Sequence, residues 1–286
     1  MVNQTIEQLL QEAIDQSMAQ TQESRELAEE VAGKMAEIDK KADDVVDRVD
    51  AAIPTAISTE LCPTIYLHPD TGDDANSGLS KSSAVKTLGA AAGKIPMGGR
   101  GIIVLAAKGL YIPLDHTVTL DRKSIRIHMD GATLEQKTYG TNSIGVFRPI
   151  NGWGEILIYG GTLKTAMFDE KVGSASSDRS LVTRTDTTTV SLKTMQTTVQ
   201  IGDQMLISYG NYANGHSELS IGHASLSFQD GVVDKKLASL ANSGTLSLSM
   251  GGTSMPGGES MSDLILGIIR AADGEPRNII TNISSL

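Results

Sequence analysis

The chain has 286 residues, of which 40% are hydrophobic but only 3% are aromatic, and its formal net charge is −10. The scarcity of aromatic residues argues against a surface that recognises bases or sugars by ring stacking. The acidic balance argues against nucleic acid as a partner, because proteins that bind phosphates draw their affinity from Lys and Arg. The single cysteine, Cys62, excludes an intrachain disulfide and a thiolate zinc site, and no cofactor is predicted.

Neither a membrane span nor a secretion signal is predicted from the sequence. No apolar run is long enough to cross a bilayer, and residues 1–11 carry acid rather than the positive region of a signal peptide. The sequence therefore predicts no membrane insertion, and a protein that is made and assembled in a cytoplasm.

Residues from about 4 to 53 contain no Pro and predict one long helix, roughly 70 Å long at the usual rise per residue. Pro54 is expected to stop this helix, and Pro63 reinforces the break. Apolar and small residues recur in alternating steps of four and three, which is the seam of a coiled coil. The seam comprises Leu10, Ile14, Ser17, Thr21, Ser24, Ala28, Val31, Met35, Ile38, Ala42, Val45, Val49 and Ala52. Its larger apolar members are predicted to be buried in a trimer: Leu10, Ile14, Val31, Met35, Ile38, Val45 and Val49.

Three hydroxyl side chains interrupt this seam at Ser17, Thr21 and Ser24, and we expect them to lower its stability while fixing its register. An alternative is an amphipathic helix that packs on its own domain or lies on a membrane. The length of the helix favours the coiled coil, and its acidic polar face disfavours a membrane.

From Thr64 onward the hydrophobic pattern changes to period two, which is typical of strands. A strand at 65–67 leads into a polar loop at 69–78 and a short helix at 84–94. Further strands are predicted at 101–106, 117–120, 124–129 and 155–159, separated by turns rich in Gly, Asp and Asn. Short strands with no helices between them suit a solenoid of coils better than a doubly wound sheet.

A third region begins near Leu181 and alternates more strongly, for example at Val190 and Leu192 or at Leu246 and Leu248. About seven strands with short links predict an antiparallel sandwich or jelly roll. The alternative is that the solenoid continues to the end.

Residues 65–112 carry a resemblance to a known family. The segment Ile-Tyr-Leu-His-Pro-Asp-Thr-Gly-Asp-Asp-Ala-Asn-Ser-Gly-Leu-Ser (65–80) is followed by Lys-Thr-Leu-Gly-Ala-Ala (86–91), a strand at 102–105 and a Gly-Leu-Tyr turn at 109–111. This resembles the opening of the pectate-lyase-like right-handed parallel β-helix of bacteriophage tailspikes and tail fibres. Asp-Gly-Ala-Thr-Leu (130–134) and Gly-Gly-Thr-Leu (160–163) resemble its successive coils, so that the resemblance covers about 100 residues.

The resemblance implies a mainly β virion protein that forms a homotrimer. Residues 1–56 would be an N-terminal coiled coil for trimerisation and virion attachment. Residues 57–180 would be a short β-helix body, which the family closes with an amphipathic helix at its first coil. Residues 181–286 would then be a C-terminal antiparallel β-sandwich head.

Candidate catalytic groups are carboxylates, which hydrolyse or eliminate within a glycan when two of them lie at the right separation. The candidates are Asp115, Asp121, Asp130, Glu135, Glu155, Asp169 and Glu170. Spacing within a strand establishes no pair among them, and no extended row of outward carboxylates is visible. We therefore assign no catalytic residue.

Metal sites are not predicted either. The acidic loop at Asp70, Asp73, Asp74 and Asn76 lacks the bidentate Glu of an EF-hand, and its side chains are good turn formers. His216 and His223 are seven residues apart, which places them on opposite faces of a strand or in separate loops.

Three loops are candidates for a recognition tip: 209–216, 251–260 and 272–278. Tyr209, Tyr212 and Arg277 are the predicted binding residues, because aromatic and Arg side chains dominate recognition. The alternative interpretation is that each of these residues belongs to an ordinary polar loop with no role in recognition.

Three functions remain open. The first is a trimeric fibre attached to phage tail or neck proteins that recognises a host surface polysaccharide or receptor with its head. The second is a collar or neck fibre, or an adaptor, without host binding. The third is a polysaccharide depolymerase tailspike. All three place the protein in the virion.

Overall fold

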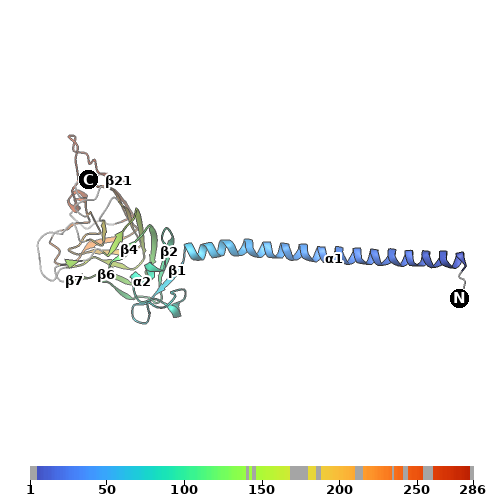
Figure 1. The fold of residues 1–286 in the computed structure, drawn as a ribbon. Helices are drawn as coiled ribbons and strands as arrows, with labels where there is room; N and C mark the ends of the chain where they lie inside the picture. Colours follow the sequence, from blue (N-terminus) through green and yellow to red (C-terminus); the bar gives the residue numbers. More distant parts are fainter. Residues whose placement is uncertain are drawn as a thin grey trace. The chain divides into compact units, whose positions relative to one another are not determined.

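A computed structural model describes residues 5–139, 142–143, 146–167, 180–184, 188–209, 215–233, 235–240, 244–253 and 260–283 of the chain. The chain divides into two compact units, Met1–Ile57 and Ser58–Leu286. The described part of the first unit is helical, and the second unit is mainly β (Figure 1).

The N-terminal helix α1 (Ile6–Leu61) has 56 residues and is about 84 Å long at the standard rise. The prediction that Pro54 ends it is wrong, because the helix continues to Leu61. A proline inside a helix removes one backbone hydrogen bond and costs about 3 kcal/mol, which kinks a helix but need not end it.

The second unit contains three sheets of parallel strands, which we name A, B and C. Sheet A contains, in spatial order, β1 (Thr64–Leu67), β2 (Arg100–Leu105), β5 (Lys123–His128), β10 (Trp153–Tyr159), β13 (Thr189–Met195), β16 (His216–Gly222), β19 (Thr245–Gly251) and β21 (Ile279–Thr281). Sheet B contains β3 (Tyr111–Leu114), β6 (Thr133–Gln136), β11 (Thr162–Lys164), β14 (Thr198–Ile201) and β17 (Ser225–Phe228). Sheet C contains β4 (Val118–Leu120), β9 (Phe147–Pro149), β12 (Val182–Arg184), β15 (Ile207–Tyr209), β18 (Ala238–Ser239) and β20 (Ile265–Leu266).

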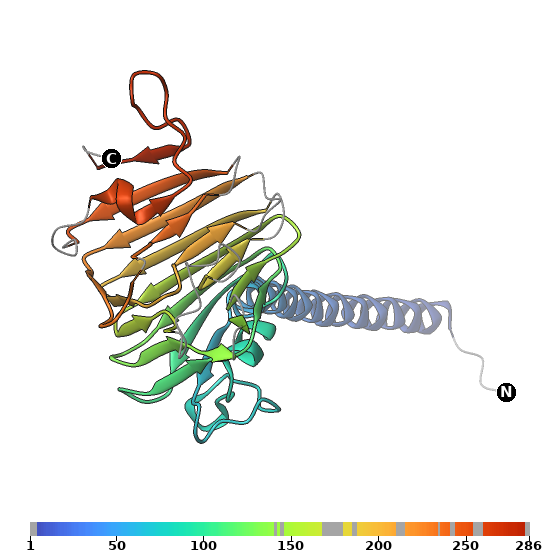
Figure 2. The ribbon, with the colours of Figure 1, turned by 90° about the vertical axis from the view of Figure 1, so that its left-hand side faces the viewer.

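From β2 onward, and apart from the β7–β8 pair, strands that follow one another in the chain belong to different sheets. From β2 to β4 the chain passes from sheet A to B to C, and it repeats this order at β13 to β15. Each strand therefore pairs with its counterparts from the preceding and following passes, and these lie side by side in Figure 2. A short antiparallel pair, β7 (Thr138–Tyr139) with β8 (Asn142–Ser143), lies outside this pattern.

The period-two pattern gives each strand one buried face, and the strand register stacks the buried residues. Ile125, Ile156, Leu192, Leu219 and Leu248 are aligned across five neighbouring strands of sheet A and are at most 2% exposed. The core thus consists of ladders of similar apolar side chains, which pack at the spacing of adjacent strands.

The predicted turns at 129–131 and 159–161 lead from sheet A to sheet B. Asp130 and Gly161 both have a positive φ, of 42° and 66°. A Cβ on Gly161 would lie 2.4 Å from the carbonyl oxygen of Ala132, so this corner requires glycine for space as well as for conformation.

The short helix α2 (Leu88–Gly93) begins four residues later than predicted. Asp74 holds the backbone before it: its carboxylate accepts hydrogen bonds from the N–H groups of Lys86 and Thr87 at 2.9 and 2.8 Å. Thr87 is the N-cap, and Leu88, with two alanines, is buried in the core. The described residues also form two further short helices, η1 (Lys81–Ser83) and α3 (Met261–Leu264).

The prediction of an antiparallel sandwich for residues 181–286 is wrong for the described strands. The strands from β12 onward pair in parallel and extend the same three sheets, and β10 pairs directly with β13 across the predicted boundary near residue 180. One isolated antiparallel bridge joins Arg270 and Pro276. Alternation of apolar residues reports which face of a strand is buried, but it does not report the direction of the partner strand.

Candidate functional site

The outward side of sheet A carries charged, hydroxyl and aromatic side chains on neighbouring strands, and we call it the sheet A outer face. Its side chains form rows across the strands, because the register aligns them. The first row contains Arg100, Ser124, Glu155, Ser191 and Glu218. The second contains Arg126, Leu157, Lys193 and Ser220, and the third contains His128, Tyr159 and Met195.

Lys193 joins two carboxylates on this face. Its Nζ lies 3.1 Å from Glu155 Oε1 and 3.3 Å from Glu218 Oε2, so these two oxygens are at most 6.4 Å apart. Both carboxylates also accept hydrogen bonds from serines on adjacent strands: Ser124 Oγ donates to Glu155 at 2.6 Å and Ser191 Oγ donates to Glu218 at 2.7 Å. The cluster thus links four successive strands of the sheet.

Burial, hydrogen bonds and neighbouring charges shift the pKa values of Glu155 and Lys193. Burial alone would raise the pKa of Glu155, but the hydrogen bonds from Ser124 and Lys193, with the charges of Lys193 and Arg100, hold it below its ordinary value. Burial alone would lower the pKa of Lys193, but its two carboxylate partners raise it overall. Glu155 is therefore ionised at neutral pH and Lys193 is protonated.

Glycosidases also place two carboxylates close together, but the protonation state of Glu155 does not match that role. A glycosidase requires one carboxylic acid whose pKa is raised, so that it can protonate the leaving group. Glu155 has a lowered pKa and is neutralised by Lys193. The arrangement is suited to holding a polar ligand with charged and hydroxyl groups rather than to general acid catalysis.

Aromatic side chains extend the face on both sides of the cluster. The rings of His128 and Tyr159 lie 5.4 Å apart, and Trp153 at the start of β10 is 37% exposed. Arg126 is exposed between these groups on β5. An exposed ring next to hydrogen-bonding charged groups is the combination that polar ligands with apolar faces require.

The structure disperses the carboxylates singled out from the sequence. Glu155 lies on sheet A and Glu135 on sheet B, where Glu135 is paired with Lys137 at 2.9 Å. Asp115 and Asp121 flank β4, and Asp130 lies in the corner after β5. Asp169 and Glu170 lie outside the described residues. Glu218 and Lys193 were not among the predicted site residues.

The predicted binding residues do not share one element. Tyr209 is the last residue of β15 in sheet C, and Arg277 is an exposed residue that precedes β21 in sheet A. Tyr212 lies outside the described residues. Their role in recognition stays a prediction.

The remaining motifs have local roles. Asp73 Oδ1 accepts the N–H of Ala75 at 2.9 Å and Asn76 donates to the carbonyl of Ala84 at 3.0 Å, so the side chains of this loop stabilise its turns. His216 is the first residue of β16 and His223 follows its end. Cys62 is a free, exposed thiol.

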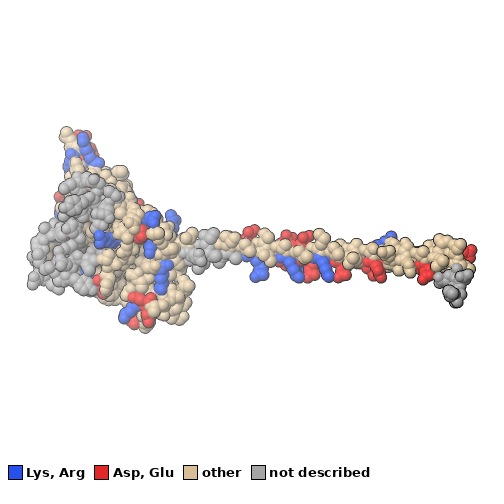
Figure 3. Space-filling view, viewed as in Figure 1, with Lys and Arg blue, Asp and Glu red and all other residues tan. Residues whose placement is uncertain are grey.

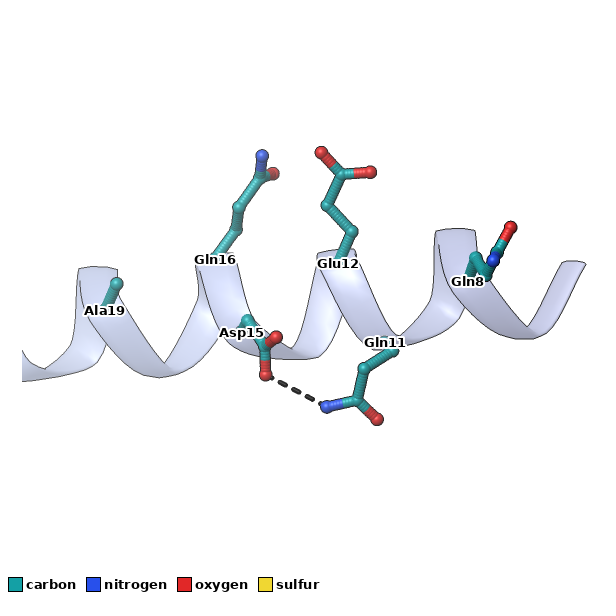
Figure 4. Close-up of a pocket in the computed structure, with 6 residues that line it drawn as sticks. All are labelled: Gln8, Gln11, Glu12, Asp15, Gln16 and Ala19. Carbon is teal, nitrogen blue, oxygen red and sulfur yellow. Dashed lines mark hydrogen bonds between the residues drawn. The ribbon is translucent and has the colours of Figure 1, made fainter. Parts of the chain in front are cut away.

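The first turns of α1 contain a shallow hollow between Gln8, Gln11, Glu12, Asp15, Gln16 and Ala19. Figure 4 shows that all six side chains project from one helix, with Gln11 donating to Asp15 at 3.0 Å. No second wall faces them in the described part of the chain, so this hollow is not a ligand site by itself.

Two further properties concern the described residues as a set. None of their helices combines the length and the apolarity that a membrane span requires. They also contain no group of three or more His, Cys, Asp or Glu side chains placed to hold a metal ion.

Comparisons with models of protein families, with curated proteins and with solved structures found no match to this chain.

Proposed function

We propose that this chain is one subunit of an elongated homotrimeric fibre of a bacteriophage virion. Its N-terminal helix would attach it to tail or neck proteins, and its three parallel sheets would form a short right-handed parallel β-helix that recognises a host cell-surface glycan or protein. The observation that carries the proposal is α1, a 56-residue helix whose apolar heptad seam is exposed.

The exposed seam requires a partner. Its larger members, Leu10, Ile14, Val31, Met35, Ile38, Val45 and Val49, are 47% to 64% exposed. A largely apolar stripe of this length is unfavourable in water, and a helix gains most of its stability from packing such a stripe. Copies of the same helix supply a matching stripe, because the heptad repeat is its own complement.

The width of the stripe favours three helices over two. With Leu10 at heptad position d and Ile14 at position a, Met18, Val46 and Ile53 fall at position e and Leu27 falls at position g. These four side chains are 49% to 62% exposed. Positions e and g are more deeply covered in a bundle of three than in a pair, so apolar residues there are better accommodated by a trimer.

The second unit suits the body of a fibre. Strands in the order A, B, C recur with matched register, as successive coils of a β-helix do, and α2 covers apolar side chains next to the first coil. The sheet A outer face would offer Trp153, Arg126 and the Glu155–Lys193–Glu218 cluster to a ligand. Three copies of such a face would gain avidity without any new contact.

The experiment that tests assembly is the solution mass of the full chain by light scattering. The proposal expects a mass near three times the 30.2 kDa of one chain. Met35→Glu together with Ile38→Glu would place charge in the seam and should give a monomer. Ala19→Glu together with Ala36→Glu adds the same charge at outer positions and should leave the trimer intact. A monomeric full chain would remove the fibre proposal.

The experiment that tests recognition is binding of the full trimer to arrays of bacterial surface glycans and to whole cells. Trp153→Ala and Arg126→Ala should weaken binding, whereas Lys108→Ala, at an exposed corner away from the face, should not. A trimer that binds no cell surface but docks on a tail or neck protein would indicate a structural virion part instead.

A further inference from the structure

We infer that three copies of α1 associate in parallel and in register, and that Lys34 of each copy pairs with Asp39 of the next copy. This inference rests on the proposed homotrimer and adds the orientation, the register and the pairing residues. It follows from the heptad frame of α1 and from the charges that flank the seam.

The basic residues of α1 are not spread evenly over the frame. Lys34, Lys41 and Arg48 all occupy position g, whereas Asp39, Val46 and Ile53 occupy position e. In a parallel, in-register bundle, each g residue faces the e residue that lies five positions later on the neighbouring helix. Lys34 then faces Asp39, Lys41 faces Val46, and Arg48 faces Ile53.

These contacts are favourable in charge and in shape. The Lys34–Asp39 pair joins opposite charges across the helix interface. Lys41 and Arg48 can lay their alkyl stems over Val46 and Ile53, which are 56% and 49% exposed in the single helix, while their charged ends reach water. No e–g contact in this arrangement brings two like charges together.

The flanking lysines are already held beside the seam within their own helix. Lys34 Nζ lies 2.7 Å from Glu30 Oε1, and Lys41 Nζ lies 2.7 Å from Glu37 Oε1. Both glutamates occupy position c, on the solvent side of the lysines. The pairs reduce the number of conformations available to the lysines before association, which lowers the entropy cost of the contacts across the interface.

The hydroxyl residues of the seam favour the same register. Thr21 Oγ1 donates to the carbonyl of Ser17 and Ser24 Oγ donates to the carbonyl of Gln20, each at 2.8 Å, so both hydroxyl hydrogens are satisfied before burial. In register, these layers meet their own copies. If one helix were shifted by one heptad along its neighbour, Ser24 would pack against Val31. The same shift at all three interfaces is also impossible, because the third helix would then be displaced from the first.

An antiparallel arrangement would distribute the hydroxyls less favourably. With the helices fully overlapped, a positions face d positions, so that Ile14 meets Val45, Thr21 meets Ile38, and Ser24 meets Met35. Two of the largest apolar seam residues would then pack against hydroxyls. The parallel arrangement keeps the apolar layers from Ala28 to Val49 intact.

Single cysteines distinguish the two orientations in the full chain, with Cys62→Ser as background. Val45→Cys occupies the seam and should form a disulfide between two copies under mild oxidation, which a non-reducing gel shows as a linked pair. Asp47→Cys lies at the outer position f and should remain unlinked. When chains with Ile14→Cys and chains with Val45→Cys are produced together, a disulfide between positions 14 and 45 would overturn the parallel orientation.

Charge exchange tests the named pair. Lys34→Glu and Asp39→Lys should each lower the melting temperature of the trimer, and the double variant should recover most of the loss. Losses that simply add in the double variant would overturn the Lys34–Asp39 contact. The particle mass is measured on the same samples. A three-chain particle with a 14–45 link overturns the orientation alone, whereas a monomer overturns the trimer on which the inference rests.

Discussion

Lys193 has a stabilising role that follows from its position between Glu155 and Glu218. Its replacement by methionine keeps an unbranched side chain but removes the ammonium, so that the two carboxylates lose the cation between them. The three side chains are 30% to 37% exposed, and solvent screening limits the effect. We expect Lys193→Met to lower the free energy of unfolding by about 1 kcal/mol, measured by urea denaturation at pH 7.

The matched control for this variant is Lys108→Met. Lys108 is an exposed lysine in the corner after β2 and has no carboxylate within ion-pair distance among the described residues. Its replacement should change the free energy of unfolding by less than about 0.5 kcal/mol. Equal effects of the two variants would show that the Glu155–Lys193–Glu218 cluster contributes nothing to stability.

His128 makes the second unit sensitive to pH. Burial, with a smaller contribution from the charge of Arg126, lowers its pKa below the ordinary value, and its Nε2 is buried without a hydrogen-bond partner. The unfolded chain therefore binds a proton more readily than the folded chain. The stability that neutral His128 provides is present above about pH 6.5, the unfolded value, and is lost as the pH falls through its folded pKa.

The variant that tests this is His128→Gln, which cannot titrate. We expect the melting temperature of the wild-type second unit to fall between pH 7 and pH 5, and this slope to be shallower in His128→Gln. Carboxylates titrate lower, so the slope below pH 4.5 should be the same in both proteins. If the melting temperatures of the wild-type protein and His128→Gln change by the same amount between pH 7 and pH 5, the role of His128 is contradicted.

At the scale of the element, sheet A depends on its internal ladder. Leu219 in β16 is fully buried and is aligned with Leu192 and Leu248 on the adjacent strands. Leu219→Ala would leave a cavity between two ordered neighbours, and we expect it to lower the free energy of unfolding by about 2 to 5 kcal/mol. Ser220 follows Leu219 in the chain and lies on the sheet A outer face. Ser220→Ala should therefore change the free energy of unfolding by less than about 0.5 kcal/mol. Equilibrium denaturation of both variants measures the difference.

The elements themselves could be predicted because their periods are local. The long helix, the strands around Ile125 and Ile156, and the corner at Asp130 all follow from residues that are close in sequence. Strand direction could not be predicted this way. Leu192 and Leu219 alternate with polar residues in a parallel strand as they would in an antiparallel one.

The candidate site could not be predicted because its members are far apart in the chain. Lys193 is 38 residues from Glu155, and Glu218 is 27 residues from Ser191. These separations depend on how many residues lie between successive strands of sheet A, and this number is not constant along the chain. Glu155 was recognised as a candidate carboxylate, but no local signal linked it to Lys193 or Glu218.

At the scale of the whole molecule, nearly all of the net negative charge lies in one element, the helix α1. Residues 6–61 contain 14 of the 34 Asp and Glu residues but only 5 of the 24 Lys and Arg residues, whereas the remaining residues are nearly balanced. Figure 3 shows the acidic side chains distributed along α1. In the proposed trimer, three acidic helices would lie within a Debye length of one another, so their mutual repulsion opposes assembly at low ionic strength.

This distribution would make the proposed trimer more stable as salt is added. Added salt would weaken the inferred Lys34–Asp39 pairs, but it would weaken the more numerous repulsions between carboxylates more, so the net effect would be stabilising. We expect the temperature at which the helical signal is lost, followed by circular dichroism, to rise when NaCl is increased from about 20 to about 200 mM. The near-neutral second unit should unfold at a temperature that changes much less. A helical transition that falls with salt would mean that attraction between flanking charges, rather than the apolar seam, holds the helices together.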